Sequence, residues 1–306
     1  MSAVSNGNPF PGLRSFEREQ AHLFFGRDDQ IRDLIERLSR NRFLPIVGMS
    51  GSGKSSLVRA GLIPNLTGSY VATETPGWRI AMLRPGRNPM HELAEKLSSE
   101  FAALDFAAAL QTLQSSSAGL ARIAQEHLVS KQKLLVLVDQ FEELFRYGEH
   151  AEPVSATNDA AAFVKLLLAA AGQGEHPLPG FDDLPVYVVT TMRSDFLGKC
   201  SRFRGLPEAL NRSQYLIPRL TREQQREVVE GPIEMEGASI EPSLVQRLLT
   251  DLGDNPDQLP ALQHALMRTW EQSAESRTEG KPITIADYEA VGGMADALNR
   301  DADQVL

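Results

Sequence analysis

The chain has 306 residues and a mass of 33.7 kDa, with a formal net charge of −9 and a pI near 5.3. This acidic balance provides no global positive field, so we expect neither a nucleic acid nor a membrane surface as partner. The single cysteine, Cys200, excludes an internal disulfide and suits a reducing compartment. Because the N-terminus is polar and the apolar runs are short, we expect a cytoplasmic protein without a membrane span.

Apolar and polar residues predict alternating helices and strands along the first two thirds of the chain. After an extended, proline-rich segment, apolar residues at helical spacing predict an amphipathic helix from Asp28. Strands separated by helical patterns are predicted at 43–47, 78–83, 133–138, 185–190 and 214–217. Because strands alternate with helices, we expect an α/β fold with a five-stranded parallel sheet and a ligand site at the carboxyl ends of the strands.

From Thr221 onward the pattern is helical only. Thr221 and Gln224 form a capping box, which opens a helix that we expect to stop at Gly231 and Pro232. Further helices are predicted at about 242–251, at about 259–273 and from about 293 to the end, with Thr284 as a cap. We therefore expect an N-terminal segment at 1–27, a nucleotide-binding domain at 28–215 and a helical lid domain at 216–306. Whether a winged-helix region begins within the last range stays open.

Residues 48–55 follow the first predicted strand and match the phosphate-binding pattern G-x-x-x-x-G-K-S/T. The glycines let the chain turn so that backbone N–H groups can face phosphate oxygens, and the helix that follows adds the positive end of its dipole. We expect Lys54 to reach the β and γ phosphates and Ser55 to hold Mg²⁺. The loop residues expected to bind nucleotide are Gly48, Ser50, Gly51, Ser52, Gly53, Lys54, Ser55 and Ser56.

Carboxylates are expected at the end of the buried third strand. Asp139 follows that strand directly, where a carboxylate can bind the Mg²⁺ shell. The next residue, Gln140, cannot act as a base, so Glu142 and Glu143 are the candidates to orient or activate the attacking water, and the sequence does not separate them. The alternative is that one or both are solvated charges in the first turn of a helix, favoured by its dipole.

An arginine is expected just beyond the fourth strand. The planar guanidinium of Arg193 suits a γ-phosphate, whose loss would be felt there. The alternative is an ion pair with Asp195 or another loop carboxylate. Because parallel strands end at one edge of a sheet, we expect Lys54, Asp139 and Arg193 to meet in one crevice.

Together these motifs resemble the STAND class, the signal-transduction ATPases with numerous domains, a branch of the AAA+-like P-loop ATPases. Within that class they are similar to the bacterial novel STAND group. The matching segments are 8–28, 51–61, 138–145, 191–198 and 259–263.

The resemblance implies a P-loop NTPase fold of the additional-strand type with a C-terminal helical lid domain. It implies that Phe25, Gly26 and Arg27 lie near adenine and ribose, and that Pro260 closes the base pocket. Gln258 stands where the group usually has glycine, whereas Pro260 by its own pattern starts a helix and His264 is an ordinary helix residue.

The place of the acids also departs from one pattern and matches another. Gln140 occupies the position of the second acid of AAA+ enzymes, and the downstream acids, Glu142 and Glu143, are spaced as in the NACHT variant.

For function, the resemblance implies a switch that binds ATP and ADP with Mg²⁺ and hydrolyses ATP slowly. ADP would hold the lid, exchange for ATP would rotate it, and the exposed surface would form a nucleotide-dependent homo-oligomer. Effector and sensor domains are expected elsewhere in a longer protein, of which this chain would be a fragment. The alternatives are an initiator-type AAA+ ATPase acting on DNA, a small-molecule kinase, and a structural module with locked nucleotide.

Overall fold

The computed structural model of the protein describes residues 7–68, 77–147, 155–174, 180–181, 183–253 and 258–294. By its contacts the chain falls into two compact units. The sheet unit consists of Arg32–Gly48 and Asn65–Ile217, and the helical unit of Met1–Ile31, Met49–Pro64 and Pro218–Leu306. The three-part domain division remains a prediction, and the helix predicted from residue 293 falls almost entirely outside the described residues.

A five-stranded sheet with only parallel pairings forms the centre of the sheet unit, in the order β2-β3-β4-β1-β5. The strands are β1 (Phe43–Gly48), β2 (Trp78–Leu83), β3 (Lys133–Val138), β4 (Val186–Arg193) and β5 (Tyr215–Leu216). Every residue of β1 is buried, as expected of a central strand covered on both faces. The predicted parallel sheet is confirmed.

One strand is longer than predicted. β4 continues to Arg193, because Thr191 and Met192 are buried and keep pairing with β1. Arg193 is therefore the last residue of β4, opposite Gly48, and does not lie beyond the strand.

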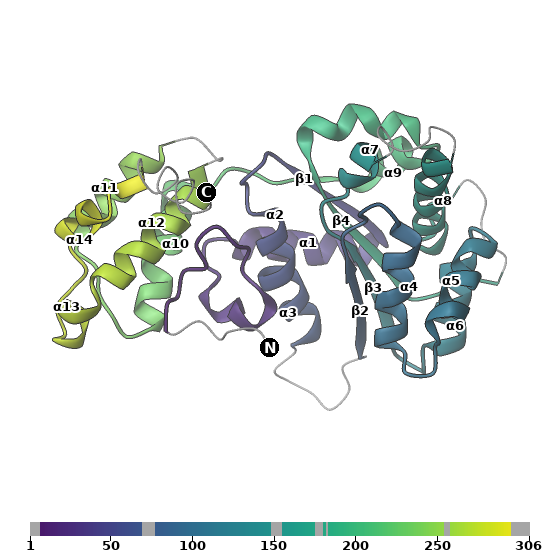
Figure 1. The fold of residues 1–306 in the computed structure, drawn as a ribbon, viewed down its shortest axis with the longest axis horizontal. Coiled ribbons are helices and arrows are strands. Elements are labelled where there is room, and N and C mark those ends of the chain that lie inside the picture. Colours follow the sequence, from purple (N-terminus) through teal and green to yellow (C-terminus); the bar gives the residue numbers. More distant parts are fainter. Residues whose placement is uncertain are drawn as a thin grey trace. The chain divides into compact units, whose positions relative to one another are not determined.

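Helices pack against the sheet and on one another in the sheet unit. Figure 1 shows α4 (Pro89–Glu100), α5 (Phe106–Ser115), α6 (Gly119–His127) and α8 (Ser155–Ala170) beside one face of the sheet. Their apolar residues join those of β1–β4 in one core cluster. Cys200 lies in this core, where burial raises the pKa of its thiol to about 11.

The other helices up to residue 213 are shorter than α4 or contain residues of both units. They are η1 (Arg18–Leu23), α1 (Asp28–Arg40), α2 (Lys54–Ser56), the π-helical η2 (Leu57–Leu62), α3 (Ile63–Thr67), α7 (Glu143–Tyr147), η3 (Ser194–Arg202) and α9 (Leu206–Ser213).

The C-terminal helical domain belongs to the helical unit and has a core of its own. Its helices are α10 (Arg222–Met235), α11 (Pro242–Leu252), α12 (Leu259–Gln272), α13 (Ala274–Thr278) and α14 (Ile285–Ala290). Both predicted caps are confirmed, since Thr221 and Thr284 each form a capping box. Within the described residues, no helix combines the length and the apolar character needed to cross a membrane.

The predicted stop of the first of these helices is wrong. α10 continues through Gly231 and Pro232 to Met235. Pro232 and Ile233 are buried, and Ile233 belongs to the core of the helical domain. Packing of this last turn therefore outweighs the local preference of glycine and proline to end a helix.

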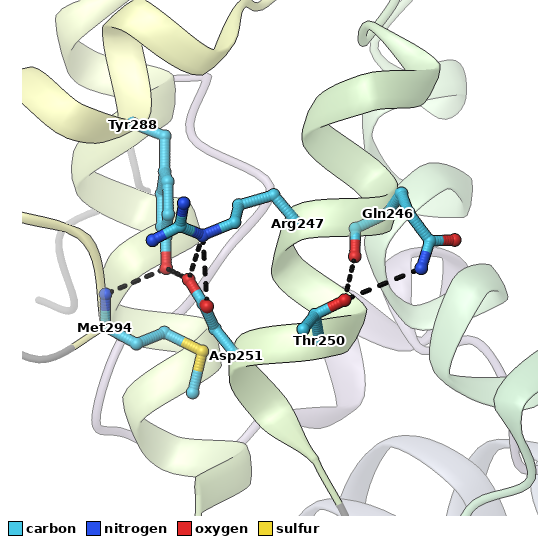
Figure 2. Close-up of polar contacts among 6 residues, drawn as sticks. All are labelled: Gln246, Arg247, Thr250, Asp251, Tyr288 and Met294. Atoms are coloured by element: carbon cyan, nitrogen blue, oxygen red, sulfur yellow. Dashed lines mark hydrogen bonds and ion pairs between the residues drawn. The ribbon is translucent and has the colours of Figure 1, made fainter.

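A buried tyrosine ties the end of the described helical domain to α11. Figure 2 shows that the hydroxyl of Tyr288 donates to Asp251 Oδ2 (2.9 Å) and accepts from the backbone N–H of Met294 (2.9 Å). Arg247 Nε donates to the same carboxylate at 3.0 Å. Only 2% of Tyr288 is exposed, and burial raises the pKa of its hydroxyl above the usual range.

We expect Tyr288→Phe to lower the free energy of unfolding by about 1–3 kcal/mol, because Met294 N–H loses its acceptor inside the protein. Urea denaturation followed by circular dichroism measures this change. Thr250→Val is the matched control, because the hydroxyl of Thr250 is exposed and its loss should change stability by less than about 0.5 kcal/mol. Equal stability of Tyr288→Phe and the wild type would contradict the expectation.

Candidate functional site

The glycine-rich loop at the end of β1 has the backbone conformation that its glycines allow. Gly51 and Gly53 have φ angles of 70° and 83°, a left-handed region that favours glycine. The helical segment begins at Lys54 and runs through α2, η2 and α3 without a gap. The Lys54 ammonium donates to the carbonyl of Met49 at 2.6 Å, which keeps its charge within the loop. The first turn of a helix, two turned glycines and a lysine together suit a phosphate group.

The helix that follows the loop is held by the N-terminal segment of the chain. The backbone N–H of Phe16 donates to Ser56 Oγ at 3.2 Å, and Arg59 forms an ion pair with Glu17 at 2.6 Å. The Ser56 hydroxyl, predicted to bind nucleotide, thus accepts a bond from this segment. Both contacts lie within the helical unit.

The Phe25–Arg27 turn lies against α10 in the helical unit. A Cβ atom built on Gly231 would lie 2.6 Å from the ring of Phe25, so this ring packs on the helix backbone. Arg27 is 5% exposed and donates to the carbonyls of Ser52 and Pro218. The predicted contact of this turn with adenine and ribose stays a prediction.

The helix start that carries Pro260 lies in the same unit. Pro260 is in the first turn of α12, and His264 is a buried residue of that helix, as their patterns indicated. With its amide nitrogen turned toward α11, Gln258 donates to the carbonyls of Asp251 (3.0 Å) and Leu252 (3.1 Å). Gln258 therefore ties this helix start to the end of α11.

At the carboxyl edge of the sheet, Asp139 is buried and held by a hydroxyl. Its exposed fraction is 1%, and Thr191 Oγ1 on β4 donates to Asp139 Oδ1 at 2.6 Å. The same Oγ1 accepts from the backbone N–H of Gln140 at 3.0 Å, where Gln140 has a φ of 56°. Thr191 thus fixes both the carboxylate and the turn that follows it.

Thr191 was not predicted as a site residue. The available signal was a pair of threonines, Thr190 and Thr191, near the end of an otherwise apolar strand. Such a pair is ordinary in a strand, because threonine is β-branched, so the pattern alone does not indicate a role.

The two acids that the sequence left unseparated have different surroundings. Glu142 is 6% exposed, and its Oε2 accepts from the backbone N–H of Arg193 at 3.4 Å. Glu143 is partly exposed and its Oε2 accepts from the backbone N–H of Gly86 at 3.0 Å. Glu142 therefore lies at the end of β4, whereas Glu143 supports the loop that follows β2.

The side chain of Arg193 forms the ion pair considered as an alternative. Its Nε and Nη2 donate to the two oxygens of Asp195 at 3.0 and 2.9 Å. The guanidinium also lies 5.7 Å from the ring centre of Phe196. The Arg193 side chain is about a third exposed in this bidentate pair. Ion pairs that are exposed to solvent contribute little to stability.

The predicted site residues thus gather in two groups. One group lies at the carboxyl ends of β1, β3 and β4 in the sheet unit and consists of Gly48, Asp139, Glu142 and Arg193. Glu143 directly follows Glu142 in the chain. The loop, the Phe25–Arg27 turn and Pro260 belong to the helical unit. Gly48, which is paired with Arg193, is followed directly by the loop in the chain.

Comparison with known proteins gives one family and one fold. The family model nSTAND1, described as Novel STAND NTPase 1, matches residues 9–306. No curated protein sequence matches the chain. Among solved structures, the Aeropyrum pernix ORC2 protein in its ADPNP-ADP complexes is similar with a TM-score of 0.60 and 14% identity, over 94% of this chain and 69% of that one.

Two further similar structures contain DNA. The Aeropyrum pernix ORC1 protein in complex with DNA has a TM-score of 0.52 and 14% identity, over 89% of this chain and 66% of that one. Drosophila ORC bound to DNA has a TM-score of 0.51 and 15% identity, over 95% and 67%. At these identities the likeness is one of fold. The comparisons lend no support to the expectation that nucleic acid is not a partner.

We expect Thr191→Val to lower the free energy of unfolding by about 1–3 kcal/mol, because it leaves a buried carboxylate oxygen and the Gln140 N–H without this hydroxyl. Denaturant titration of both proteins measures the loss. Thr191→Ser keeps the hydroxyl and should recover most of it. A valine variant as stable as the wild type would show that these hydrogen bonds contribute nothing to stability.

Proposed function

Because the chain belongs to the novel STAND NTPase 1 family, we propose that it binds ATP and ADP with Mg²⁺ and hydrolyses ATP slowly as a signalling switch. One observation carries the proposal. The ends of β1, β4 and β3 lie side by side, so that Gly48 is paired with Arg193 and Asp139 is bonded to Thr191. This is the edge at which parallel α/β sheets bind their ligands.

The loop residues supply the phosphate site. Backbone N–H groups of Gly51–Ser56 would bind phosphate oxygens, and Lys54 would offset the charge of the β and γ groups. The Ser55 hydroxyl and the Asp139 carboxylate would hold Mg²⁺, which offsets phosphate charge when bound. A buried carboxylate with one oxygen already fixed by Thr191 suits this hard cation.

The surroundings of the two acids favour Glu142 as the residue that positions and deprotonates water. Its carboxylate lies at the end of β4 with the other site residues, and it is shielded from bulk water. Glu143 is bound to Gly86 N–H and keeps the loop after β2 in place. Arg193 would leave Asp195 to contact the γ-phosphate, a charge that offers a stronger partner than an exposed carboxylate.

The switch itself would work through the helical domain, acting as the lid. The loop and this domain share one compact unit, and the Phe25–Arg27 turn contacts both. Phe25, Gly26, Arg27 and Pro260 would enclose adenine and ribose. A change of nucleotide would then move the lid and expose a surface for homo-oligomers, which brings attached effector and sensor domains together in a cytoplasm.

We expect Lys54→Ala to weaken Mg²⁺-ATP binding by about a hundredfold, because the phosphates lose a charged hydrogen bond. Isothermal titration calorimetry measures the affinity. Lys96→Ala is the control, because Lys96 is a partly exposed lysine of α4 paired with Glu95. Equal affinities for all three proteins would remove the loop from nucleotide binding.

Glu142→Gln should slow ATP turnover by about a hundredfold or more while leaving nucleotide affinity unchanged, because the amide cannot accept the proton of water. Phosphate release under saturating ATP measures turnover. Glu143→Gln should keep most of the rate, since its amide oxygen can still accept from Gly86 N–H. A loss confined to Glu143→Gln would exchange the two roles, and full turnover in the double variant would exclude both acids.

A further inference from the structure

Arg27 joins the phosphate loop to the start of the helical domain. Its Nη1 donates to the carbonyl of Pro218 at 2.9 Å, and its Nη2 donates to the carbonyl of Ser52 at 3.3 Å. Ser52 lies in the loop between the two glycines with left-handed backbone. Pro218 is the first residue after the chain leaves the sheet unit, three residues before the cap of α10. One guanidinium therefore connects Ser52 and Pro218, which are 166 positions apart in the chain (218 − 52).

The guanidinium is buried, so these bonds count for more than they would at the surface. Arg27 is 5% exposed, and Ser52 is 6% exposed. A buried charge without such acceptors would be strongly destabilising, and charged hydrogen bonds are the stronger kind. The planar fork of arginine can serve two carbonyls at once in a fixed geometry, which the point charge of lysine cannot.

The residues before Arg27 attach the same turn to α10. Gly26 has a φ of 77°, and a Cβ atom there would lie 2.6 Å from the carbonyl oxygen of Gln224 and 2.9 Å from Val228. Phe25 packs on Gly231 one turn further along the helix. Only glycine at residues 26 and 231 allows so close an approach. Any movement of α10 must therefore move the Phe25–Arg27 turn or break these contacts.

The N-terminal segment also attaches to the domain core further out. Phe10 is 3% exposed within the core of the helical domain and lies edge-on to Trp270. Asn8 donates to the carbonyl of Met267 in α12 at 3.0 Å. The segment that ends at Arg27 is thus fixed to α12 at one end and to α10 at the other.

We propose that Arg27 is a positioning residue that transmits the state of the phosphate loop to the hinge of the helical domain at Pro218. This role rests on the proposed nucleotide binding. Loop amides that turn toward phosphates on nucleotide binding would also turn the peptide carbonyls, among them that of Ser52. Because Arg27 holds that carbonyl and the carbonyl of Pro218 together, a shift at the loop alters the hinge.

The competing explanation is that Arg27 only stabilises the fold. The two roles differ in what they predict at saturating nucleotide. A purely stabilising arginine affects how much protein is folded, whereas a transmitting arginine affects how the hinge responds once nucleotide is bound.

The test compares the wild type, Arg27→Lys and Arg42→Lys. Arg42 is the matched control, because it too donates to a backbone carbonyl, that of Leu184 at 2.7 Å, but lies before β1. Amide hydrogen exchange of residues 218–228 is measured by mass spectrometry in ADP and in a non-hydrolysable ATP analogue, each saturating with Mg²⁺. Calorimetry gives the affinity of each variant for both nucleotides.

We expect the exchange of residues 218–228 to differ between the two nucleotides in the wild type and in Arg42→Lys. In Arg27→Lys this difference should be lost although calorimetry shows that both nucleotides still bind and saturate the protein. A full difference in Arg27→Lys, or none in the wild type that binds both nucleotides, would overturn the role of Arg27 alone. A wild type that binds neither nucleotide would overturn the proposed function and this inference together.

Should Arg27→Lys fail to fold, the wild type alone decides. The proposal requires exchange at residues 25–27 and 218–228 to change together when the ADP form is converted to the ATP-analogue form. A change in one segment without the other would contradict it.

Discussion

The parallel pairing of β1 with β4 is the constraint on which the candidate site depends. It places Gly48, where the phosphate loop begins, opposite Arg193, while the parallel pairing of β4 with β3 places Thr191 within reach of Asp139. A shift of one residue in this register would turn Thr191 to the other face of the sheet. The buried hydrogen bond between Thr191 and Asp139 adds its own penalty for such a slip, because the buried carboxylate would lose this donor. Strand register and site chemistry therefore stabilise one another.

The sequence predicted the sheet and the loop well, because both follow from local patterns. Apolar runs marked the strands, and the spacing of Gly53 and Lys54 marked the loop. It did not predict the end of α10, because Pro232 stays helical through burial that no local pattern encodes. Thr191 was missed for the same reason. Its role comes from a partner 52 residues away in the chain, and only the strand order brings the two together.

Glu142 and Glu143 are adjacent in the chain, but the start of a helix between them gives their carboxylates different partners. Glu142 directly precedes α7 and Glu143 is its first residue; consecutive residues of a helix point about a hundred degrees apart, so the two side chains face different surroundings. Here one carboxylate meets a backbone N–H at the end of β4, and the other meets a backbone N–H after β2. The sequence gives equal weight to both, whereas the partners differ. The two acids downstream of Asp139 thus contact different parts of the sheet unit, Glu142 the end of β4 and Glu143 the loop after β2.

Proline in the last turn of α10 has a mechanical meaning for the segment packed on it. Pro232 has no N–H to donate to the carbonyl of Val228, so the helix lacks one backbone hydrogen bond here and bends most easily at this point. The ring of Phe25 covers Gly231, the adjoining residue, and Gly26 approaches Val228 itself. The N-terminal segment therefore packs against α10 at the point where this helix bends most easily, and it stiffens the helix there.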